Sequence, residues 1–373
     1  MTFIAQRLQY FDSSDFREVF NRKQLLKNPV DLSVGEPEEH TTDFIKEAGI
    51  RAINENKTTY TPANGIVDLR IAIAKKLNEE NGLNCNEEAV TIVPGLTTGQ
   101  LLIYMAILDP GDEVLVMDPY YPPYNYLASS IGAHVTLVSV LPDFQPDLPM
   151  IEASITSRTK AIVINSPGNP TGVVYPESTL RKIASIAEEH GLLVISDEIY
   201  EHFVYENKHF SIGSIYPNTL TLNGFSKEFA MTGWRIGYIA GPKDIIEAIN
   251  ELQQYMVFAS SSIAQYAALA ALSQRPTING KYLRKRDVVR KSLQDMGYTV
   301  HGMQGAFYSF FKAPNDITDI EFVEKLAERN LILVPGRAFS RLHGFVRLSY
   351  GANITQVEKG LDILAEVTSE MRS

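Results

Sequence analysis

The sequence predicts an α/β fold in which helices cover both faces of a mostly parallel sheet, with a smaller α+β domain beside it. Three observations lead to this prediction. Between residues 89 and 240, short apolar runs alternate with segments that have apolar residues at helical spacing. The apolar runs carry no regular polar face, which is typical of parallel strands buried on both sides. After residue 275 the order of strands and helices changes to that of an α+β unit.

The first part of the chain is predicted to consist of helices separated by loops. Apolar residues at helical spacing predict helices at residues 15–27, 42–56 and 67–81. Glycine and proline mark two loops between these helices, at residues 33–37 and 60–65.

Seven strands are expected next, because each is a short apolar run bounded by turn residues or by helical sequence. They lie at residues 89–93, 113–117, 135–140, 161–164, 192–196, 219–222 and 236–240. Among them, helices are expected up to residue 108, after residue 124 and at residues 176–189. A long helical region follows the last strand, at residues 242–272.

The rest of the chain follows a different order of elements. Helices are expected at residues 281–296, 320–329 and 354–371, and strands at residues 306–311, 331–334 and 345–350. This order predicts a large domain and a small one. The large domain takes residues 45–275, and the small domain takes residues 1–44 and 276–373.

Composition excludes several classes of protein. The net charge is −10 and no Lys/Arg-rich block occurs, which argues against a nucleic-acid-binding surface. No stretch approaches the ~20 apolar residues of a membrane span. Cys85 is the only cysteine and the seven histidines show no metal-ligand spacing, so neither a disulfide nor a metal site is expected. Without a signal-like N-terminus, we expect a cytoplasmic protein.

Polar and small residues follow the predicted strands directly. In open parallel sheets, ligands bind outside the carboxyl ends of the strands. The residues at those ends are therefore the candidate site. They are Gly95, Leu96, Thr97, Tyr121, Asn169, Asp197 and Lys227.

An amine–aldehyde cofactor such as pyridoxal 5'-phosphate makes demands that these residues can meet. Its aldehyde needs a lysine that holds it as a Schiff base and later moves a proton, and Lys227 can do both. Its ring nitrogen needs a carboxylate, and Asp197 lies at a strand end. Its phosphate needs backbone N–H groups and a cation. The helix start after Pro94 and the nearby Arg235 would supply them.

Two further parts of such a cofactor also find candidates. The ring hydroxyl needs hydrogen-bond donors, and Asn169 with Tyr200 could provide them. The ring face needs an aromatic side chain, for which Tyr121 is the candidate. Because Tyr120 and Tyr124 lie in the same run, the sequence leaves open which of the three rings stacks on the cofactor.

Three motifs together point to a family. They are Ser-Pro-Gly-Asn-Pro-Thr-Gly at 166–172, Ser-Asp-Glu-Ile-Tyr at 196–200, and the stretch 224–237, which holds Lys227 and, eight residues later, Arg235. Over roughly residues 30–370 the sequence resembles the fold-type-I, pyridoxal-phosphate-dependent aminotransferases of class I/II, the aspartate aminotransferase-like family. The resemblance implies the large and small domains of that fold, and pyridoxal 5'-phosphate as the cofactor.

The resemblance also implies a role for each candidate residue. Lys227 binds the cofactor and is the catalytic acid and base. The residues that contact the cofactor ring are Tyr121, Asn169, Asp197 and Tyr200. The residues that contact its phosphate are Leu96, Thr97, Ser226 and Arg235.

The substrate and a second subunit are implied in the same way. Gly35, Asn169 and Arg347 match positions that bind the substrate, with Arg347 holding its α-carboxylate. Tyr60 matches a tyrosine that reaches the phosphate of the neighbouring subunit, which implies a homodimer with shared active sites. Tyr60 could also be an ordinary packing residue.

The implied activity is transfer of an amino group from an L-amino acid to a 2-oxo acid by a ping-pong mechanism. A β-lyase (C–S lyase) or a synthase on the same scaffold is the alternative, because one fold supports several reactions.

Departures from the family pattern bear on the substrate. Position 97 is Thr, where aspartate-preferring bacterial relatives have Lys, and position 224 is Gly, where many relatives have a phosphate-binding Ser. Glu38 and Glu39 stand near the substrate-closing loop. If these acids face the substrate, they disfavour a dicarboxylate and favour a neutral or basic side chain. Both acids could equally be solvated.

Overall fold

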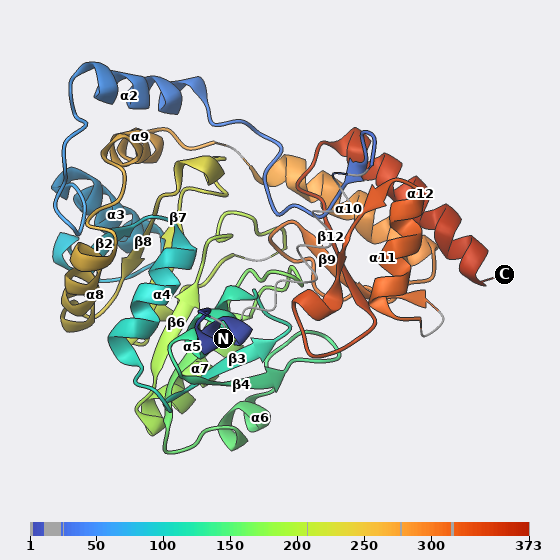
Figure 1. Ribbon diagram of the computed structural model, residues 1–373, viewed down its shortest axis with the longest axis horizontal. Helices are drawn as coiled ribbons and strands as arrows, with labels where there is room; N and C mark the ends of the chain where they lie inside the picture. The colour runs from blue at the N-terminus through green and yellow to red at the C-terminus, as the bar shows by residue number, and fades with distance from the viewer. Residues whose placement is uncertain are drawn as a thin grey trace.

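The computed structural model describes residues 3–10, 24, 26–206, 208–276, 278–314 and 317–372. Its centre is a seven-stranded sheet in the order β2-β8-β7-β6-β5-β3-β4 (Figure 1). The strands are β2 (Val90–Val93), β3 (Glu113–Asp118), β4 (His134–Ser139), β5 (Thr159–Asn165), β6 (Leu193–Asp197), β7 (Thr219–Gly224) and β8 (Gly237–Ala240). The predicted strands of the large domain are thus confirmed.

The direction of one strand matters for the site. β3 pairs in parallel with β4 and β5, and parallel pairing continues from β5 through β6 to β7. β8 lies between β2 and β7 and is antiparallel to both. The start of β8 therefore lies at the same edge of the sheet as the carboxyl ends of the other strands. Arg235, just before β8, is placed at that edge.

Helices surround this sheet. They are α2 (Asp43–Asn54), α3 (Val67–Glu80), α4 (Leu96–Ile107), α5 (Pro123–Ser130), α6 (Leu148–Ala153), α7 (Glu177–His190), α8 (Lys243–Met256) and α9 (Ser262–Ser273). Short 3₁₀ turns occur at Gln6–Tyr10, Glu87–Ala89, Ile212–Ser214, Thr232–Trp234 and Gly336–Ala338. The six-residue α6, which Asp147 caps through the N–H of Met150, has no counterpart among the predicted helices.

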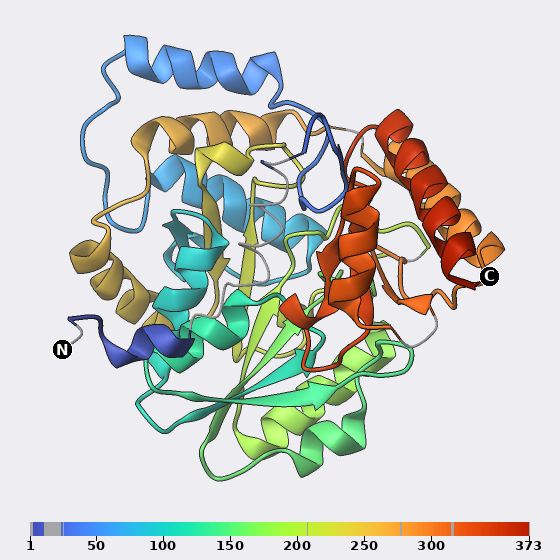
Figure 2. The same cartoon turned by 45° about the vertical axis from the view of Figure 1, so that its right-hand side comes forward.

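Both faces of the sheet are covered because successive residues of a strand point to opposite sides. In β3, Val114 and Val116 belong to a core formed with α4, α5 and α8. Leu115 and Met117 point the other way, into a core formed with α6 and α7. A further core joins β2 and β8 to α3 and α9, and α2 packs across α9 (Figure 2).

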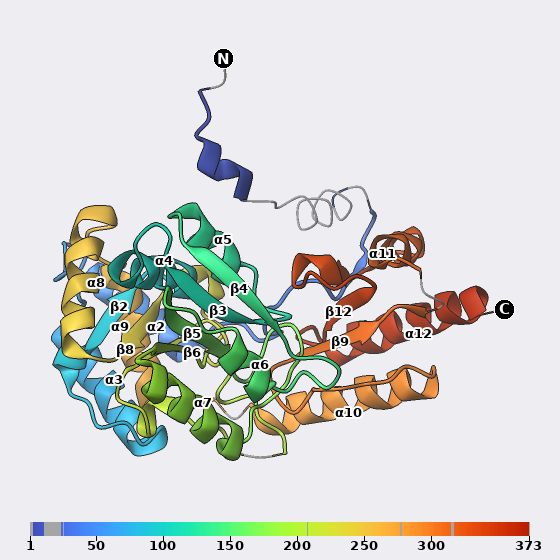
Figure 3. The same ribbon diagram turned by 90° about the horizontal axis from the view of Figure 1, so that it is seen from below.

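The C-terminal part has its own small sheets. Its elements are α10 (Asn279–Asp295), β9 (Tyr308–Lys312), α11 (Asp319–Glu328), β10 (Leu331–Ile332), β11 (Val334–Pro335), β12 (Phe345–Ser349) and α12 (Ile354–Arg372). An antiparallel sheet has the order β11-β12-β9, and β10 pairs in parallel with β1 (Val30–Asp31) from the N-terminal segment. Figure 3 shows α10 and α12 side by side on this part.

The pairing of β1 with β10 supports grouping the N-terminal segment with the C-terminal part. The division of the chain into residues 45–275 and residues 1–44 with 276–373 remains our proposal.

Two predicted elements are wrong in their extent. The helical region at 242–272 is two helices, because the chain turns at Phe258, which has a φ of +66°, and Ser261 caps the start of α9. The strand predicted at 331–334 is two short strands, because β10 pairs with β1 whereas β11 pairs with β12. Most of the helix predicted at 15–27 lies outside the described residues. Within the described ranges, no helix has the length and apolarity needed to cross a bilayer.

Candidate active site

A cavity of about 320 Å³ lies at the carboxyl edge of the large sheet, where the strand ends meet the C-terminal elements. It brings together every predicted site residue except Gly95 and Tyr60. Those residues are Gly35, Leu96, Thr97, Tyr121, Asn169, Asp197, Tyr200, Ser226, Lys227, Arg235 and Arg347. Residues that are far apart in the sequence therefore line one cavity.

Asp197, the last residue of β6, is a buried carboxylate held by two hydrogen bonds. Its Oδ2 accepts from the hydroxyl of Tyr124 at 2.6 Å, and its Oδ1 accepts from the backbone N–H of Ile199 at 3.2 Å. Burial raises the pKa of Asp197 to about 6, although both hydrogen bonds lower it. A carboxylate in this position can pair with a protonated ring nitrogen.

Lys227 lies in the turn after β7, and its amine faces the cavity. Its Nζ donates to the backbone oxygen of Gly35 at 2.6 Å. Burial, together with the charges of Arg347 and Arg235, lowers the pKa of Lys227 to about 8, while the carboxylate of Glu36 opposes this shift. An amine with this pKa is uncharged in a useful fraction of molecules near neutral pH, as a nucleophile and proton acceptor must be.

An anion site is formed where β2 leads into α4. Gly95 has a φ of +83° and precedes the first turn of α4, which Leu96 and Thr97 begin. A Cβ at Gly95 would collide with the guanidinium of Arg235. Glycine thus lets Arg235 lie against the backbone at the N-terminus of α4, where unpaired N–H groups and the helix dipole favour an anion such as a phosphate.

Position 224 is glycine for a packing reason. A Cβ there would lie 2.9 Å from the Cα of Gly237, because β7 and β8 are paired closely at this point. A serine would displace one strand from the other. Ser226, two residues after the end of β7, lines the cavity.

Arg347, on β12, is a buried cation with a free hydrogen-bonding atom. Its Nη1 donates to Oδ1 of Asn169 at 3.0 Å, and its Nη2 donates to the backbone oxygen of Ser33. Its Nε has no partner within the described residues. The guanidinium lies 4.8 Å from the ring centre of Tyr308 and 4.4 Å from that of Phe339. A planar cation held this way suits a carboxylate.

Asn169 has two structural roles. Its backbone N–H donates to Oδ1 of Asn165 at 2.8 Å, which is a turn-forming interaction. Its side chain reaches the cavity and contacts Arg347. Asn169 is thus both a turn residue and a lining residue.

The three tyrosines at positions 120, 121 and 124 differ in their positions relative to the cavity. Tyr120 is buried in the core of the sheet and does not line the cavity. Tyr124 does line it, but its hydroxyl is committed to Asp197. Tyr121 is half-buried, and its ring contacts that of Tyr124 edge-on at 5.5 Å. Of the two tyrosines that line the cavity, Tyr121 is the one that is not bonded to Asp197.

Tyr60 is not part of the cavity of its own chain. It is 84% exposed, and its ring lies 4.4 Å from that of Phe258.

Several residues of the cavity were not predicted as site residues, among them Tyr308 and Tyr124. The hydroxyl of Tyr308, on β9, lies 2.6 Å from that of Tyr200, and its ring lies beside Arg347. Tyr124 was considered only as a stacking ring, not as the partner of Asp197. The signal for Tyr308 is the register of β9 and β12, which places it diagonally opposite Arg347. That register cannot be read from either strand alone.

Glu38 and Glu39 do not face the cavity, so the expectation that they disfavour a dicarboxylate loses its basis. Glu39 accepts a hydrogen bond from Tyr282 at 2.5 Å, and Glu38 pairs with Lys285 at 3.1 Å. Both partners belong to α10. The two acids hold the loop to the C-terminal part, because opposite charges on α10 attract them away from the cavity.

Comparisons with known proteins agree with this geometry. The family described as "Aminotransferase class I and II" matches residues 27–365. The aspartate/prephenate aminotransferase of Thermus thermophilus is 40% identical over 349 residues, with 91% of this chain and 90% of the relative covered. The aromatic-amino-acid aminotransferase 2 of Thermococcus litoralis is 33% identical over 385 residues, with 99% of each covered.

A solved structure shows the same fold. The structure titled "aspartate aminotransferase from Thermus thermophilus with maleate" superposes with a TM-score of 0.94 and 38% identity, over 98% of this chain and 100% of that chain. These relatives are aminotransferases, so the comparisons support amino-group transfer and not the lyase or synthase alternative. This chain belongs to the class I and II aminotransferase family, whose aspartate aminotransferase-type members depend on pyridoxal phosphate.

Proposed function

We propose that this aminotransferase binds pyridoxal 5'-phosphate through Lys227 and moves amino groups between L-amino acids and 2-oxo acids in two half-reactions. The observation that carries the proposal is the set of residues that line one cavity. A lysine whose pKa is lowered to about 8 shares it with a buried carboxylate, Asp197, and two separate arginines. One arginine is needed for the phosphate of the cofactor, and the other for the carboxylate of the substrate.

The donor set fits the parts of this cofactor. Arg235 and the N-terminus of α4 would hold the phosphate, with Thr97 and Ser226 adding hydroxyl groups. Asp197 would accept a hydrogen bond from the ring nitrogen. The Tyr200 hydroxyl would donate to the ring oxygen, together with the Asn169 amide. Tyr121 would cover one face of the ring.

The chain's own residues would carry out the following work. When bound, the cofactor supplies an aldehyde that condenses with amines and a ring that withdraws electrons from the substrate Cα. The guanidinium of Arg347 binds the substrate α-carboxylate and so orients the Cα–H bond. The Nζ of Lys227 would accept the Cα proton and would later act as the proton donor. Asp197, whose carboxylate accepts from Tyr124 and Ile199, would pair with a protonated ring nitrogen.

A neutral amino donor is the substrate class that we propose. The cations among the described residues that line the cavity are Lys227, Arg235 and Arg347, and each already has a role. Thr97 offers a hydroxyl where a cation would be needed for a second carboxylate. The remaining walls include Val34, Tyr308 and Phe339, which favour an apolar or aromatic side chain.

We also propose a homodimer with shared active sites. Tyr60 supports this proposal, because it is highly exposed and does not reach the cavity of its own chain. Phe258, whose ring lies against that of Tyr60, is exposed as well. Tyr255 and Val257, which precede Phe258 in the chain, are also exposed. An exposed aromatic group of this kind is typical of a surface that a second subunit covers. A cytoplasmic location rests on the sequence alone and remains a prediction.

Substitution of Lys227 tests the proposal directly. Wild-type protein with pyridoxal phosphate should show an absorbance band of lysine-bound cofactor, and borohydride should attach the cofactor to Lys227. Lys227→Ala should lose both signals and all transfer activity. Labelling of a different lysine would overturn the proposal.

A screen of the common amino acids tests the substrate class. Each amino acid alone should convert the cofactor stoichiometrically to its amine form, read from the absorbance, and neutral or aromatic donors should react fastest. A clear preference for aspartate, as in the names of several relatives, would contradict the neutral-donor assignment.

A further inference from the structure

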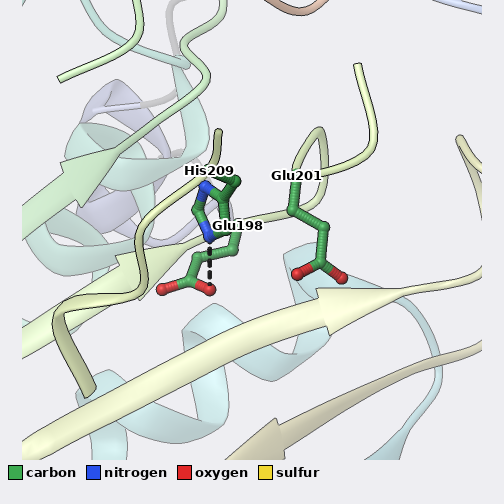
Figure 4. A group of neighbouring side chains, drawn as sticks. All are labelled: Glu198, Glu201 and His209. Atoms are coloured by element: carbon green, nitrogen blue, oxygen red, sulfur yellow. Dashed lines mark hydrogen bonds and ion pairs between the residues drawn. The ribbon is translucent and has the colours of Figure 1, made fainter. Parts of the chain in front are cut away.

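A group of buried charged side chains lies behind the cavity, on the far side of the turn that carries Asp197. Glu198 and Glu201 follow β6, and His209 comes from the next loop (Figure 4). Their potential ligand atoms all lie within 4.8 Å of one another. Carboxylates and an imidazole this close together could suit a metal ion.

Hydrogen-bond donors of the protein already occupy the carboxylate oxygens of this group. Both oxygens of Glu201 accept hydrogen bonds from protein groups: Oε1 from the ammonium of Lys76 and from Asn223 at 2.6 Å, and Oε2 from Asn81 at 2.5 Å. The side chain of Lys76 is only 6% exposed and pairs with Glu201 as a salt bridge. Lys76 therefore supplies the positive charge that a metal ion would otherwise bring.

Glu198 is paired in the same manner. Its Oε1 accepts from the hydroxyls of Ser196 at 2.9 Å and Ser211 at 2.7 Å. Its Oε2 lies 2.9 Å from Nε2 of His209, as the dashed line in Figure 4 shows, and 3.2 Å from the amide of Asn81. Although burial lowers it, the pKa of His209 is raised overall because Glu198 attracts its proton. The group is a hydrogen-bonded ion network.

The network contacts the turn after β6 and the end of β7. Both lead to side chains that we propose as cofactor-binding. Along residues 197–201 the side chains diverge: Asp197 and Tyr200 line the cavity, whereas Glu198 and Glu201 enter the network. The backbone N–H of Glu198 also donates to Leu222 of β7 at 2.9 Å.

A second connection runs along β7 itself. Asn223 donates to Glu201 through its Nδ2, and its Oδ1 accepts from the backbone N–H of Gly224 at 2.7 Å. Gly224 ends β7, and Lys227 follows three residues later. Lys76 of α3 and Asn81, which caps the end of that helix, both donate to Glu201 and so anchor the turn after β6.

From this arrangement we propose that Lys76, Glu201 and Asn223 are positioning residues of the active site. Through Glu201, they hold the turn that carries Asp197 and Tyr200 at a set distance from the turn that carries Lys227. This inference rests on the roles proposed above for Asp197, Tyr200 and Lys227 in binding pyridoxal phosphate. It adds residues that touch neither cofactor nor substrate.

The chemistry of the network favours a positioning role over a purely stabilising one. Buried ion pairs contribute little net stability compared with well-packed apolar side chains, because both charges must leave water. Their hydrogen bonds are directional, however, and fix the relative position of the groups that they join. A network that spans α3, β6 and β7 therefore sets geometry that apolar packing alone would leave looser.

The test uses Lys76→Met, with Lys75→Met as the matched control. Lys75 is the preceding residue of α3, is 71% exposed and pairs only loosely with Glu79, at 3.9 Å. Each protein is prepared without cofactor and titrated with pyridoxal phosphate at a temperature well below its own unfolding transition. Cofactor affinity, the pH at which the bound-cofactor absorbance changes, kcat and KM are measured.

We expect Lys76→Met to bind pyridoxal phosphate about tenfold more weakly or worse, with kcat lowered roughly 10- to 100-fold. The absorbance titration should move to higher pH, because the buried network loses one positive charge and, among the described residues, Glu201 keeps only His202, at 3.2 Å, as an ion-pair partner. KM for the amino donor should change less than about threefold, because Arg347 lies outside the network. Lys75→Met should match the wild type in every measurement.

Asn223→Ala keeps the result decisive if Lys76→Met does not fold. This variant leaves all the charges in place and removes only the links from Asn223 to Glu201 and Gly224. It should weaken cofactor binding about threefold to tenfold and shift the absorbance titration in a folded protein. Lower thermal stability with unchanged affinity and spectrum in the folded network variants would overturn the inference. If the wild type and Lys75→Met themselves showed no absorbance band of cofactor bound to Lys227, the proposed function would fail instead.

Discussion

At the scale of single residues, the two titratable groups that matter most in the cavity have pKa values shifted toward neutrality. Lys227 and Asp197 are both buried, and burial disfavours the charged form of each. The pKa of the lysine therefore falls and that of the carboxyl group rises. Such opposed shifts are typical of residues that exchange protons in a reaction.

The pH dependence of cofactor uptake follows from the pKa of Lys227. Below about pH 8 the side chain is an ammonium ion, and above it a free amine that can attack an aldehyde. The rate of pyridoxal phosphate incorporation into cofactor-free protein should therefore rise with pH and reach half its maximum near 8. Stopped-flow absorbance from about pH 6.5 to 9.5 measures this. A rate without pH dependence across that range would contradict it.

Asp197→Asn should reduce turnover while the protein stays folded. An amide cannot hold a proton on the ring nitrogen, so a charged hydrogen bond of about 1.5–3 kcal/mol is lost, and kcat should fall roughly 10- to 100-fold. Tyr124→Phe is the matched control. It keeps the carboxylate and removes one of its donors, so its effect should be smaller. Equal losses in both variants would show that geometry, not charge, is what Asp197 provides.

At the scale of elements, the reversed direction of β8 completes the site. Most of the cavity residues follow the carboxyl ends of parallel strands, but Arg235 precedes β8. Because β8 is antiparallel to β2 and β7, its start lies beside the N-terminus of α4. Gly95, without a side chain, allows the guanidinium to approach the helix end. One strand reversal thus brings a cation to an anion-binding helix terminus.

Gly95→Ala tests this arrangement, with Gly111→Ala as the control. Both glycines have positive φ, +83° and +95°, so both variants carry a backbone strain of about 1–2 kcal/mol. Space around Gly111 is open, whereas a Cβ at Gly95 displaces Arg235. Both should lose a similar amount of unfolding free energy, but only Gly95→Ala should weaken pyridoxal phosphate binding, by about tenfold or more. Equal affinities for pyridoxal phosphate in the two variants would show that Arg235 does not contribute to phosphate binding.

At the scale of the whole molecule, the exposed Tyr60 predicts that two chains share their active sites. Tyr60→Ala should weaken cofactor binding, and Lys227→Ala should abolish activity. When the two variants are mixed, unfolded and refolded together, about half of the dimers should be mixed. In each mixed dimer, one site combines an intact Lys227 with an intact Tyr60 from the other chain.

Mixing should therefore restore about a quarter of the wild-type activity at limiting cofactor. Sedimentation should show a dimer. No recovery on mixing would mean that Tyr60 acts within its own chain or only in packing.

Much of the fold and of the site could be predicted from the sequence, because the signals are local. Apolar runs and helical spacing identify the elements, and the strand ends identify where Asp197 and Lys227 must lie. The sequence by itself therefore determined the α/β class, the edge that carries the chemistry and most of the residues that line the cavity. Element lengths were less well predicted where a break depends on a single backbone conformation, as at Phe258.

Only the tertiary structure decided how these parts face one another. The direction of β8 brings Arg235 to the cavity, and the register of β9 and β12 brings Tyr308 beside Arg347. The pairing of Lys76 with Glu201 joins residues 125 positions apart. Each of these depends on contacts between distant segments, which local propensity does not encode. For the same reason, the sequence left open whether the acids at 38 and 39 face the substrate, and the structure places them against α10.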